Sequence, residues 1–135
     1  MTTYQVPVSR LSSVREALAL LRRSKRVILT THVQADGDGV GSQAALLSLI
    51  HAAGGEGWIV NPTPIPRALR FLLADPSRAL DANGEDARTR CQQADLCVVV
   101  DTGERSRIGR VMSLVDHLPL LVIDHHPMGD EPLGN

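Results

Sequence analysis

Four short runs of the chain are almost entirely apolar, and more polar segments with a helical repeat separate them. The runs are Val27–Thr30, Trp58–Val60, Leu96–Val100 and Leu120–Ile123. Continuous apolar runs of this length are typical of strands that are buried on both faces of a sheet. Their alternation with helical segments predicts the α/β class, as a doubly wound, mostly parallel sheet with helices on both faces.

The segments between these runs carry helix signals. The first predicted helix covers residues 13–23, with Ser13 and Glu16 in the positions of a capping box. A glycine pair stops the second predicted helix, and prolines at alternate positions make residues 61–66 a connector. Residues 75–95 are polar and ambiguous apart from one helical stretch. The remaining predicted helices cover residues 41–53, 67–73, 85–93 and 108–115.

Composition narrows the possible functions. The chain of 135 residues predicts one domain, and its 43% hydrophobic and 21% charged residues are ordinary for a globular protein. The net charge of −1 and the lack of a basic tract argue against binding to long nucleic acids, although a short oligonucleotide or small phosphate ester stays possible. No apolar run approaches the ~20 residues of a membrane span, and no signal peptide is evident. We therefore expect a cytoplasmic protein without membrane contact, with Cys91 and Cys97 as reduced thiols.

Metal-binding residue types follow three of the four predicted strands. The segment from His32 to Asp38 follows the first strand, Asp101 follows the third, and Asp124-His125-His126 follows the fourth. The carboxyl ends of parallel strands meet at one edge of a sheet, where ligands bind in this fold class. No other predicted strand end carries such residues. The pattern therefore predicts one cleft with several carboxylates and three imidazoles, which suits divalent metal.

Each cluster taken alone has another interpretation. Asp36 and Asp38 could form a solvated acidic turn or cap the following helix, and Asp101 could cap the next turn. A calcium loop of the EF-hand type requires a closing glutamate, but Leu47 is the twelfth residue counted from Asp36. A dinucleotide-binding glycine motif is also disfavoured, because Ser42 stands where its last glycine belongs.

The donor types indicate which metal and which chemistry to expect. Histidine and carboxylate without thiolate favour Mn²⁺ or Mg²⁺ over structural zinc. There are more donors than one ion needs, so two ions ~3.5–4 Å apart that share a bridging carboxylate are expected, with phosphoester hydrolysis as their chemistry. Asp101 is our candidate for the bridge. In extended chain His125 and His126 point opposite ways, so we expect one to bind metal and the other substrate, with Asp124 orienting a ring by a hydrogen bond.

Three motifs resemble those of the DHH phosphoesterase superfamily, in particular the nanoRNase/pAp phosphatase relatives of the RecJ exonucleases. They are Thr31–Ser42, Val100–Thr102 and Ile123–Pro127, and the resemblance extends over residues 12–135. It implies that His32 and Asp36 hold one metal, Asp38 and His125 the other, with Asp101 bridging them and His126 contacting the scissile phosphate. It also implies a preference for Mn²⁺, and short oligonucleotides or 3′-phosphoadenosine 5′-phosphate as substrates.

The chain also departs from that superfamily. Its members continue into a fourth motif with another metal-binding aspartate and a C-terminal substrate-binding domain called DHHA1. The resemblance therefore implies that residues 1–135 are a fragment or a truncated N-terminal DHH domain, or one that a partner completes, with weak or no activity by itself. Manganese pyrophosphatase, cyclic-dinucleotide phosphodiesterase and a non-catalytic metal- or nucleotide-binding module stay open as alternatives, and the oligomeric state is undetermined. His51 and His117 are interpreted as surface and turn residues rather than as ligands. Arg105 and Arg107 follow Asp101 closely and could reach a phosphate, although a solvated or salt-bridged role is favoured for both.

Overall fold

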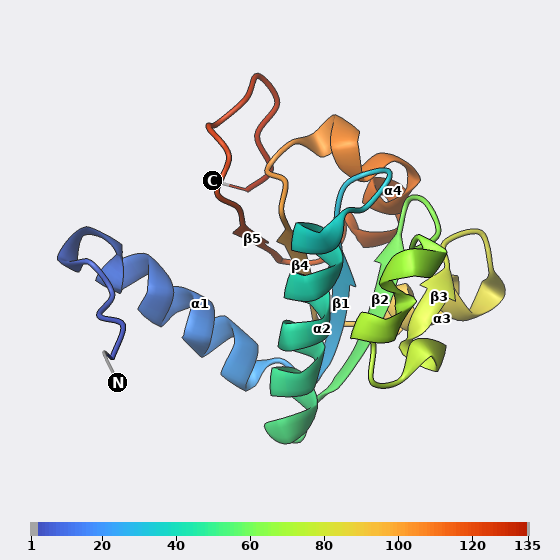
Figure 1. Cartoon of the computed structure of the whole chain (residues 1–135), viewed down its shortest axis with the longest axis horizontal. Coiled ribbons are helices and arrows are strands. Elements are labelled where there is room, and N and C mark those ends of the chain that lie inside the picture. The colour runs from blue at the N-terminus through green and yellow to red at the C-terminus, as the bar shows by residue number, and fades with distance from the viewer. Residues whose placement is uncertain (1–2, 135) are drawn as a thin grey trace.

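A computed structural model describes residues 3–134 as a five-stranded sheet with helices on both of its faces (Figure 1). The strands are β1 (Arg26–Thr30), β2 (Glu56–Asn61), β3 (Ala79–Asp81), β4 (Leu96–Val100) and β5 (Leu120–Ile123). The α-helices are α1 (Leu11–Arg23), α2 (Gly37–Ala52), α3 (Glu85–Gln93) and α4 (Met112–Val115). Four 3₁₀ segments complete the elements: η1 (Val8–Arg10), η2 (Arg67–Leu72), η3 (Pro76–Arg78) and η4 (Arg105–Val111).

All strand pairs are parallel, in the order β3-β2-β1-β4-β5. The chain builds outward from β1 to β3, then returns to place β4 on the other side of β1. This reversal between β1 and β4 is the topological switch point at which ligands bind in doubly wound folds. The predicted fold class is thereby confirmed.

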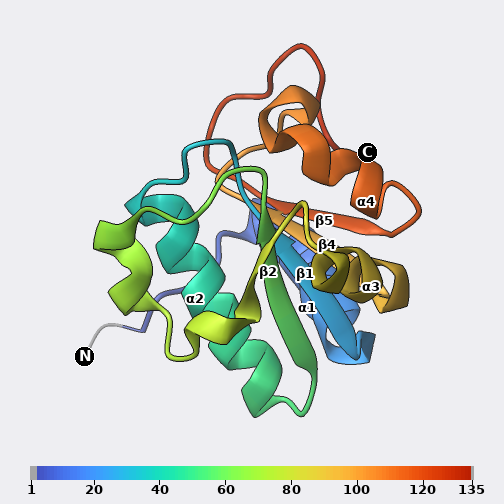
Figure 2. The ribbon, with the colours of Figure 1, turned by 90° about the vertical axis from the view of Figure 1, so that its right-hand side faces the viewer.

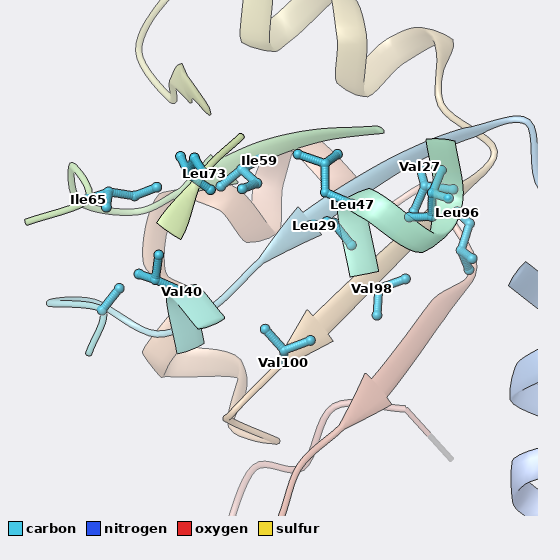
Figure 3. Packing of buried hydrophobic residues seen from close by; sticks show 12 residues of the cluster. Val27, Leu29, Val40, Leu47, Ile59, Ile65, Leu73, Leu96, Val98 and Val100 are labelled. Atoms are coloured by element: carbon cyan, nitrogen blue, oxygen red, sulfur yellow. The ribbon is translucent and has the colours of Figure 1, made fainter. Parts of the chain in front are cut away.

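Alternate residues of the central strands belong to two separate hydrophobic cores, one on each face of the sheet. On one face, β1 and β4 contribute Val27, Leu29, Val98 and others, which pack with residues of α2 (Figure 3). On the other face Ile28 packs with residues of α3, η4 and α4. Figure 2 shows α2 on one side of the sheet and α3 and α4 on the other. Because both faces of β1 and β4 are covered, these strands form a rigid base for the loops that follow them.

The structure corrects several predicted element boundaries. The predicted capping box is wrong, because η1 runs directly into α1 at Leu11 and leaves Ser13 inside the helix. The second helix begins at Gly37 rather than residue 41, because the Asp36 side chain caps it by accepting hydrogen bonds from the backbone N–H groups of Asp38 and Gly39. The acidic loop is correspondingly shorter than expected.

Other differences concern the segments with weak patterns. The strand β3 was not foreseen, because its three residues lie in a polar stretch. Its last residue is Asp81, so a fourth strand also has a carboxylate at its end. The helix predicted over residues 108–115 is a 3₁₀ segment followed by one turn of α4, broken at Gly109 with φ 51°. The helix over residues 85–93 is confirmed as α3. Within residues 3–134, no helix combines the length and apolar character needed to span a membrane.

The first turn of α2 packs closely against the end of β1 at Gly39. A Cβ atom at this position would lie 2.7 Å from Thr31 Oγ1, and that hydroxyl is held by donating to the Val100 carbonyl at 2.8 Å. We therefore expect Gly39→Ala to lower the free energy of unfolding by about 1–3 kcal/mol, the usual cost of overpacking. Urea denaturation measures this change.

Gly41 provides the matched control on the same helix. A Cβ there meets nothing within 4 Å. Gly41→Ala should be neutral or stabilising by up to about 1 kcal/mol, because alanine favours helix over glycine. Equal losses of stability in the two variants would contradict the proposed close contact.

Both cysteines are free and buried in the same core, Cys91 on α3 and Cys97 on β4. Burial raises the pKa of the Cys91 thiol to about 11, and it raises the pKa of the Cys97 thiol further. Since the thiolate is the reactive form, we expect neither thiol to react rapidly with Ellman's reagent in the native protein, and both to react in urea. Rapid labelling of one thiol without denaturant would show that the core opens there.

Candidate metal centre

The three metal-binding clusters meet at the carboxyl edge of the sheet. His32 follows β1, Asp101 follows β4, and Asp124 follows β5, and these three strands are neighbours. In Figure 2 the segments that follow these strands lie together above the sheet. A buried hydrogen bond from Thr31 Oγ1 to the Val100 carbonyl, 2.8 Å long, joins the ends of β1 and β4. It fixes the residues that follow, His32 and Asp101, side by side.

The carboxylate of Asp101 lies between two imidazoles. Its Oδ2 is 3.2 Å from His32 Nε2, and its Oδ1 is 2.9 Å from His125 Nε2. The residue is buried, and its backbone has φ 60°, a left-handed conformation that aspartate tolerates better than most residues. Its N–H donates to the Ile123 carbonyl at 3.0 Å, so β5 helps to hold this backbone.

The ring of His32 has a defined tautomer. Its Nδ1 lies 2.7 Å from the Val33 carbonyl oxygen, which can only accept, so Nδ1 carries the hydrogen. Nε2 then faces two carboxylate oxygens, Asp101 Oδ2 and, at 3.7 Å, Asp36 Oδ2. Nε2 and the two carboxylate oxygens thus point toward one another, as donor atoms around a shared cation do.

Asp36 uses its two oxygens differently. Oδ1 caps α2, at 3.0 Å from the Asp38 nitrogen and 3.1 Å from the Gly39 nitrogen, while Oδ2 faces His32. Hydrogen bonding from the Gly39 backbone is the main cause that holds the pKa of Asp36 below its ordinary value, against partial burial, which acts to raise it. The capping interpretation of this aspartate is thus correct for one oxygen, and the other remains available as a ligand.

Asp38 occupies a different position from the one expected. It belongs to the first turn of α2 and lines a cavity of about 550 Å³ together with Asp101, Asp124 and His125. However, its carboxylate joins neither of the two groups of closely spaced donor atoms found among the described residues. The early start of α2, which Asp36 caps, places Asp38 on the helix instead of on a loop.

The segment after β5 presents two histidines to two different carboxylates. His125 faces Asp101, whereas His126 Nδ1 donates to Asp124 Oδ1 at 2.6 Å. Asp124 Oδ1 also accepts from the backbone N–H groups of both histidines. The rings do not point opposite ways, because the chain leaves β5 at Ile123 and bends; their centroids are 4.3 Å apart.

The contact between Asp124 and His126 affects both groups. Burial acts to raise the pKa of Asp124, but hydrogen bonds from the His126 side chain and backbone outweigh it, and the pKa lies below its ordinary value. The pKa of His126 is raised, chiefly by the same hydrogen bond, while the charge of Arg107 acts in the opposite direction. The same hydrogen bond therefore lowers the pKa of the carboxyl group and raises the pKa of the ring.

Together the donors form two groups that share one residue. His32, Asp36 and Asp101 make one group, with donor atoms within 4.8 Å of one another. Asp101 also belongs to the second group, with Asp124, His125 and His126. Carboxylate oxygens and imidazole nitrogens are suitable ligands for divalent ions such as Mn²⁺, so the residues present fit a metal centre. Asp101 directs one oxygen toward each group, which is the geometry that a bridging carboxylate needs.

Several residues around the centre were not foreseen. Thr31 bonds across to β4, and the backbone carbonyl of Arg107 accepts from the Val33 N–H at 2.8 Å, which ties η4 to the loop that carries His32. Nothing in the local pattern distinguishes Thr31, because its partner is 69 residues away. The structural interpretation of His51 agrees with the structure, where its ring accepts from the Gly57 N–H at 3.3 Å.

Comparison with known proteins identifies relatives for this arrangement. The family model of the DHH family, N-terminal domain, matches residues 26–134. The bifunctional oligoribonuclease and PAP phosphatase NrnA of Mycoplasma pneumoniae is 27% identical over 133 residues, which cover 92% of this chain and 37% of NrnA. The cyclic-di-AMP phosphodiesterase GdpP of Bacillus subtilis is 26% identical over 128 residues, which cover 83% of this chain and 18% of GdpP.

Solved structures share the fold. An exopolyphosphatase-related protein from Bacteroides fragilis superposes with a TM-score of 0.80 and 20% identity over 95% of this chain and 38% of that protein. The exonuclease RecJ bound to manganese superposes with a TM-score of 0.59 and 23% identity over 98% of this chain and 31% of RecJ. The chain thus spans less than two fifths of the length of these relatives.

Replacing Asp101 by asparagine tests the centre. Asparagine keeps the shape and tolerates φ 60° but loses the charge. Mn²⁺ should raise the melting temperature of the wild type, because a ligand that binds only the folded state stabilises it. In Asp101→Asn the affinity for Mn²⁺ should fall further than it does when a residue that only supports a metal ligand is lost, which costs about 10- to 100-fold. Thermal shift and calorimetry with Mn²⁺ measure both effects.

Asp116→Asn is the matched control, because it removes the same charge from an exposed turn beside His117. Its response to Mn²⁺ should equal that of the wild type. A full Mn²⁺ response in Asp101→Asn, or an equal loss in the control variant, would rule out Asp101 as the shared ligand.

Proposed function

Because the chain belongs to the DHH family and matches its N-terminal domain, we propose that it is the metal-binding part of a phosphoesterase. The proposed substrates are short oligonucleotides or small nucleotides such as 3′-phosphoadenosine 5′-phosphate. The observation that carries the proposal is the position of Asp101, with one oxygen toward His32 and the other toward His125. A carboxylate placed in this way can hold two cations at a fixed separation. The name of NrnA supports the proposed substrate class.

In this proposal the donor groups hold Mn²⁺, with Mg²⁺ as a possible substitute. His32 and Asp36 would bind one ion, His125 would bind the other, and Asp101 would bind both. Asp38 would have to approach from α2 to complete the ligands of the second ion. The bound ions would activate water and offset the negative charge of the phosphate. RecJ, which shares the fold, was solved with manganese, and this supports the choice of ion.

The chain's own residues would position the phosphate. Asp124 holds the His126 ring through Nδ1 at 2.6 Å, so that Nε2 stays free and, when the ring is protonated, donates a hydrogen bond to a phosphate oxygen. A cationic imidazole makes a stronger hydrogen bond to an anion than a neutral one does. We therefore assign substrate binding to His126 and orientation of its ring to Asp124.

The domain assignment forms part of the same proposal. The chain covers 37% of NrnA and 38% of the Bacteroides protein, so their remaining lengths have no counterpart in these 135 residues. We propose that residues 1–135 act as an N-terminal domain whose substrate contacts are completed by a further domain. By themselves they should then hydrolyse substrate only weakly.

Single-turnover hydrolysis tests this function. With the chain in excess over 3′-phosphoadenosine 5′-phosphate or a dinucleotide, we expect slow product formation that requires Mn²⁺. Asp101→Asn should slow it by at least about 100-fold, since metal activation and charge stabilisation are lost together. Chromatography of the nucleotides measures the rate, and Asp116→Asn is again the control.

The same assay separates the alternatives. Cyclic di-AMP belongs in the panel because GdpP is a relative, and pyrophosphate because two-metal centres also cleave it. Preference for either compound would replace the proposed substrate class. Tight binding of Mn²⁺ and nucleotide without any hydrolysis would favour a non-catalytic binding module.

A further inference from the structure

A second cavity adjoins the proposed metal centre. Its volume is about 400 Å³, within the range of about 300–1,000 Å³ of small-molecule sites. Asp124, His126, Glu104 and Arg107 line it, together with residues of β5 and of the segments that follow β4 and β5. Asp124 also lines the cavity that contains Asp101, so the two cavities are neighbours.

One oxygen of each acidic group in this second cavity already accepts hydrogen bonds from the protein. Asp124 Oδ1 accepts from the His125 backbone and from the ring and backbone of His126. Glu104 Oε2 accepts from the Glu131 N–H at 3.3 Å, whereas its Oε1 is buried beside Gly129 without a hydrogen-bond partner among the described residues. These hydrogen bonds offset part of the negative charge that the two carboxylates bring to the cavity.

Arg107, in contrast, has no carboxylate partner within residues 3–134. Its backbone is nevertheless fixed on both sides. The Arg107 carbonyl accepts from the Val33 N–H at 2.8 Å, and its own N–H donates to the Glu104 carbonyl at 3.2 Å. The loop that carries His32 and the segment after β4 thus hold this arginine at the cavity beside His126. The guanidinium remains available for an anion.

We propose that Arg107 binds a second phosphate of the substrate, one that is not hydrolysed, in the cavity that it shares with His126. The guanidinium offers paired N–H donors that match two oxygens of a phosphate. His126 lines this cavity and also belongs to the donor group of Asp101, so a nucleotide with two phosphates could reach both places. This inference rests on the proposed phosphoesterase function and adds to it the residue that recognises the second phosphate of such a nucleotide.

Ligand binding tests the inference. Adenosine 3′,5′-bisphosphate and the two adenosine monophosphates are titrated in Mn²⁺ by calorimetry, and chromatography verifies that each ligand stays intact. The wild type should bind the bisphosphate more tightly than either monophosphate. Arg107→Gln should reduce this preference by at least about tenfold, because hydrogen bonds to charged groups contribute that much or more. Arg107→Lys, which keeps a point charge, should give an intermediate value.

Arg105→Gln is the matched control, because it removes the same charge two residues away and Arg105 does not line the cavity. It should keep the preference of the wild type. The main-chain hydrogen bonds of Arg107 do not depend on its side chain, and circular dichroism of both variants checks the fold.

Several results would overturn the inference. They are an absent preference in the wild type, an unchanged preference in Arg107→Gln, an equal loss in Arg105→Gln, or equal weakening of all three ligands. The last result would mean that Arg107 contacts the reacting phosphate. The hydrolysis assay separates this inference from the proposed function. If the preference for the bisphosphate depends on Arg107 but no hydrolysis occurs, only the proposed function is contradicted. If hydrolysis occurs but Arg107→Gln keeps the preference, only this inference is contradicted.

Discussion

The position of the Asp101 carboxylate is the constraint on which the candidate site depends. Parallel pairing of β1, β4 and β5 brings three loops to one edge, but pairing alone fixes strands and not side chains. The buried bond from Thr31 to the Val100 carbonyl and the N–H of Asp101 bonded to Ile123 fix the backbone on both sides. Asp101 accepts a left-handed conformation there, which lets one carboxylate face imidazoles from two different strands.

The site also shows that a structural and a chemical role can coexist in one side chain. Asp36 ends the loop after β1 by capping α2 with Oδ1, while Oδ2 faces His32. The cap starts the helix early, and Gly39 then lets the first turn approach Thr31. The packing that brings Asp36 to His32 is therefore the same packing that places Asp38 on the helix, outside both donor groups.

The sequence predicted those features that local pattern determines. Apolar runs marked four of the five strands, and the residues after them marked the loops, because burial on both faces requires continuous apolar sequence. β3 has three residues in a polar stretch, too few to show a period. The start of α1 depends on a 3₁₀ turn after Pro7, and the contacts of Thr31 and Arg107 join distant segments. Such contacts leave no local signal, so only the fold could reveal them.

Electrostatics connects the two cavities. The larger one is lined by Asp38, Asp101 and Asp124 and would repel a phosphate unless cations were present. The positive charge of Arg107 lies on the other side of Asp124, beside His126, where one oxygen of each carboxylate already accepts hydrogen bonds. A phosphate ester can thus be held by protein groups in one cavity, whereas in the other it needs metal ions. Asp124 and His126 are therefore shared between the cavity in which the protein would bind a phosphate and the donor groups that would hold the metal ions.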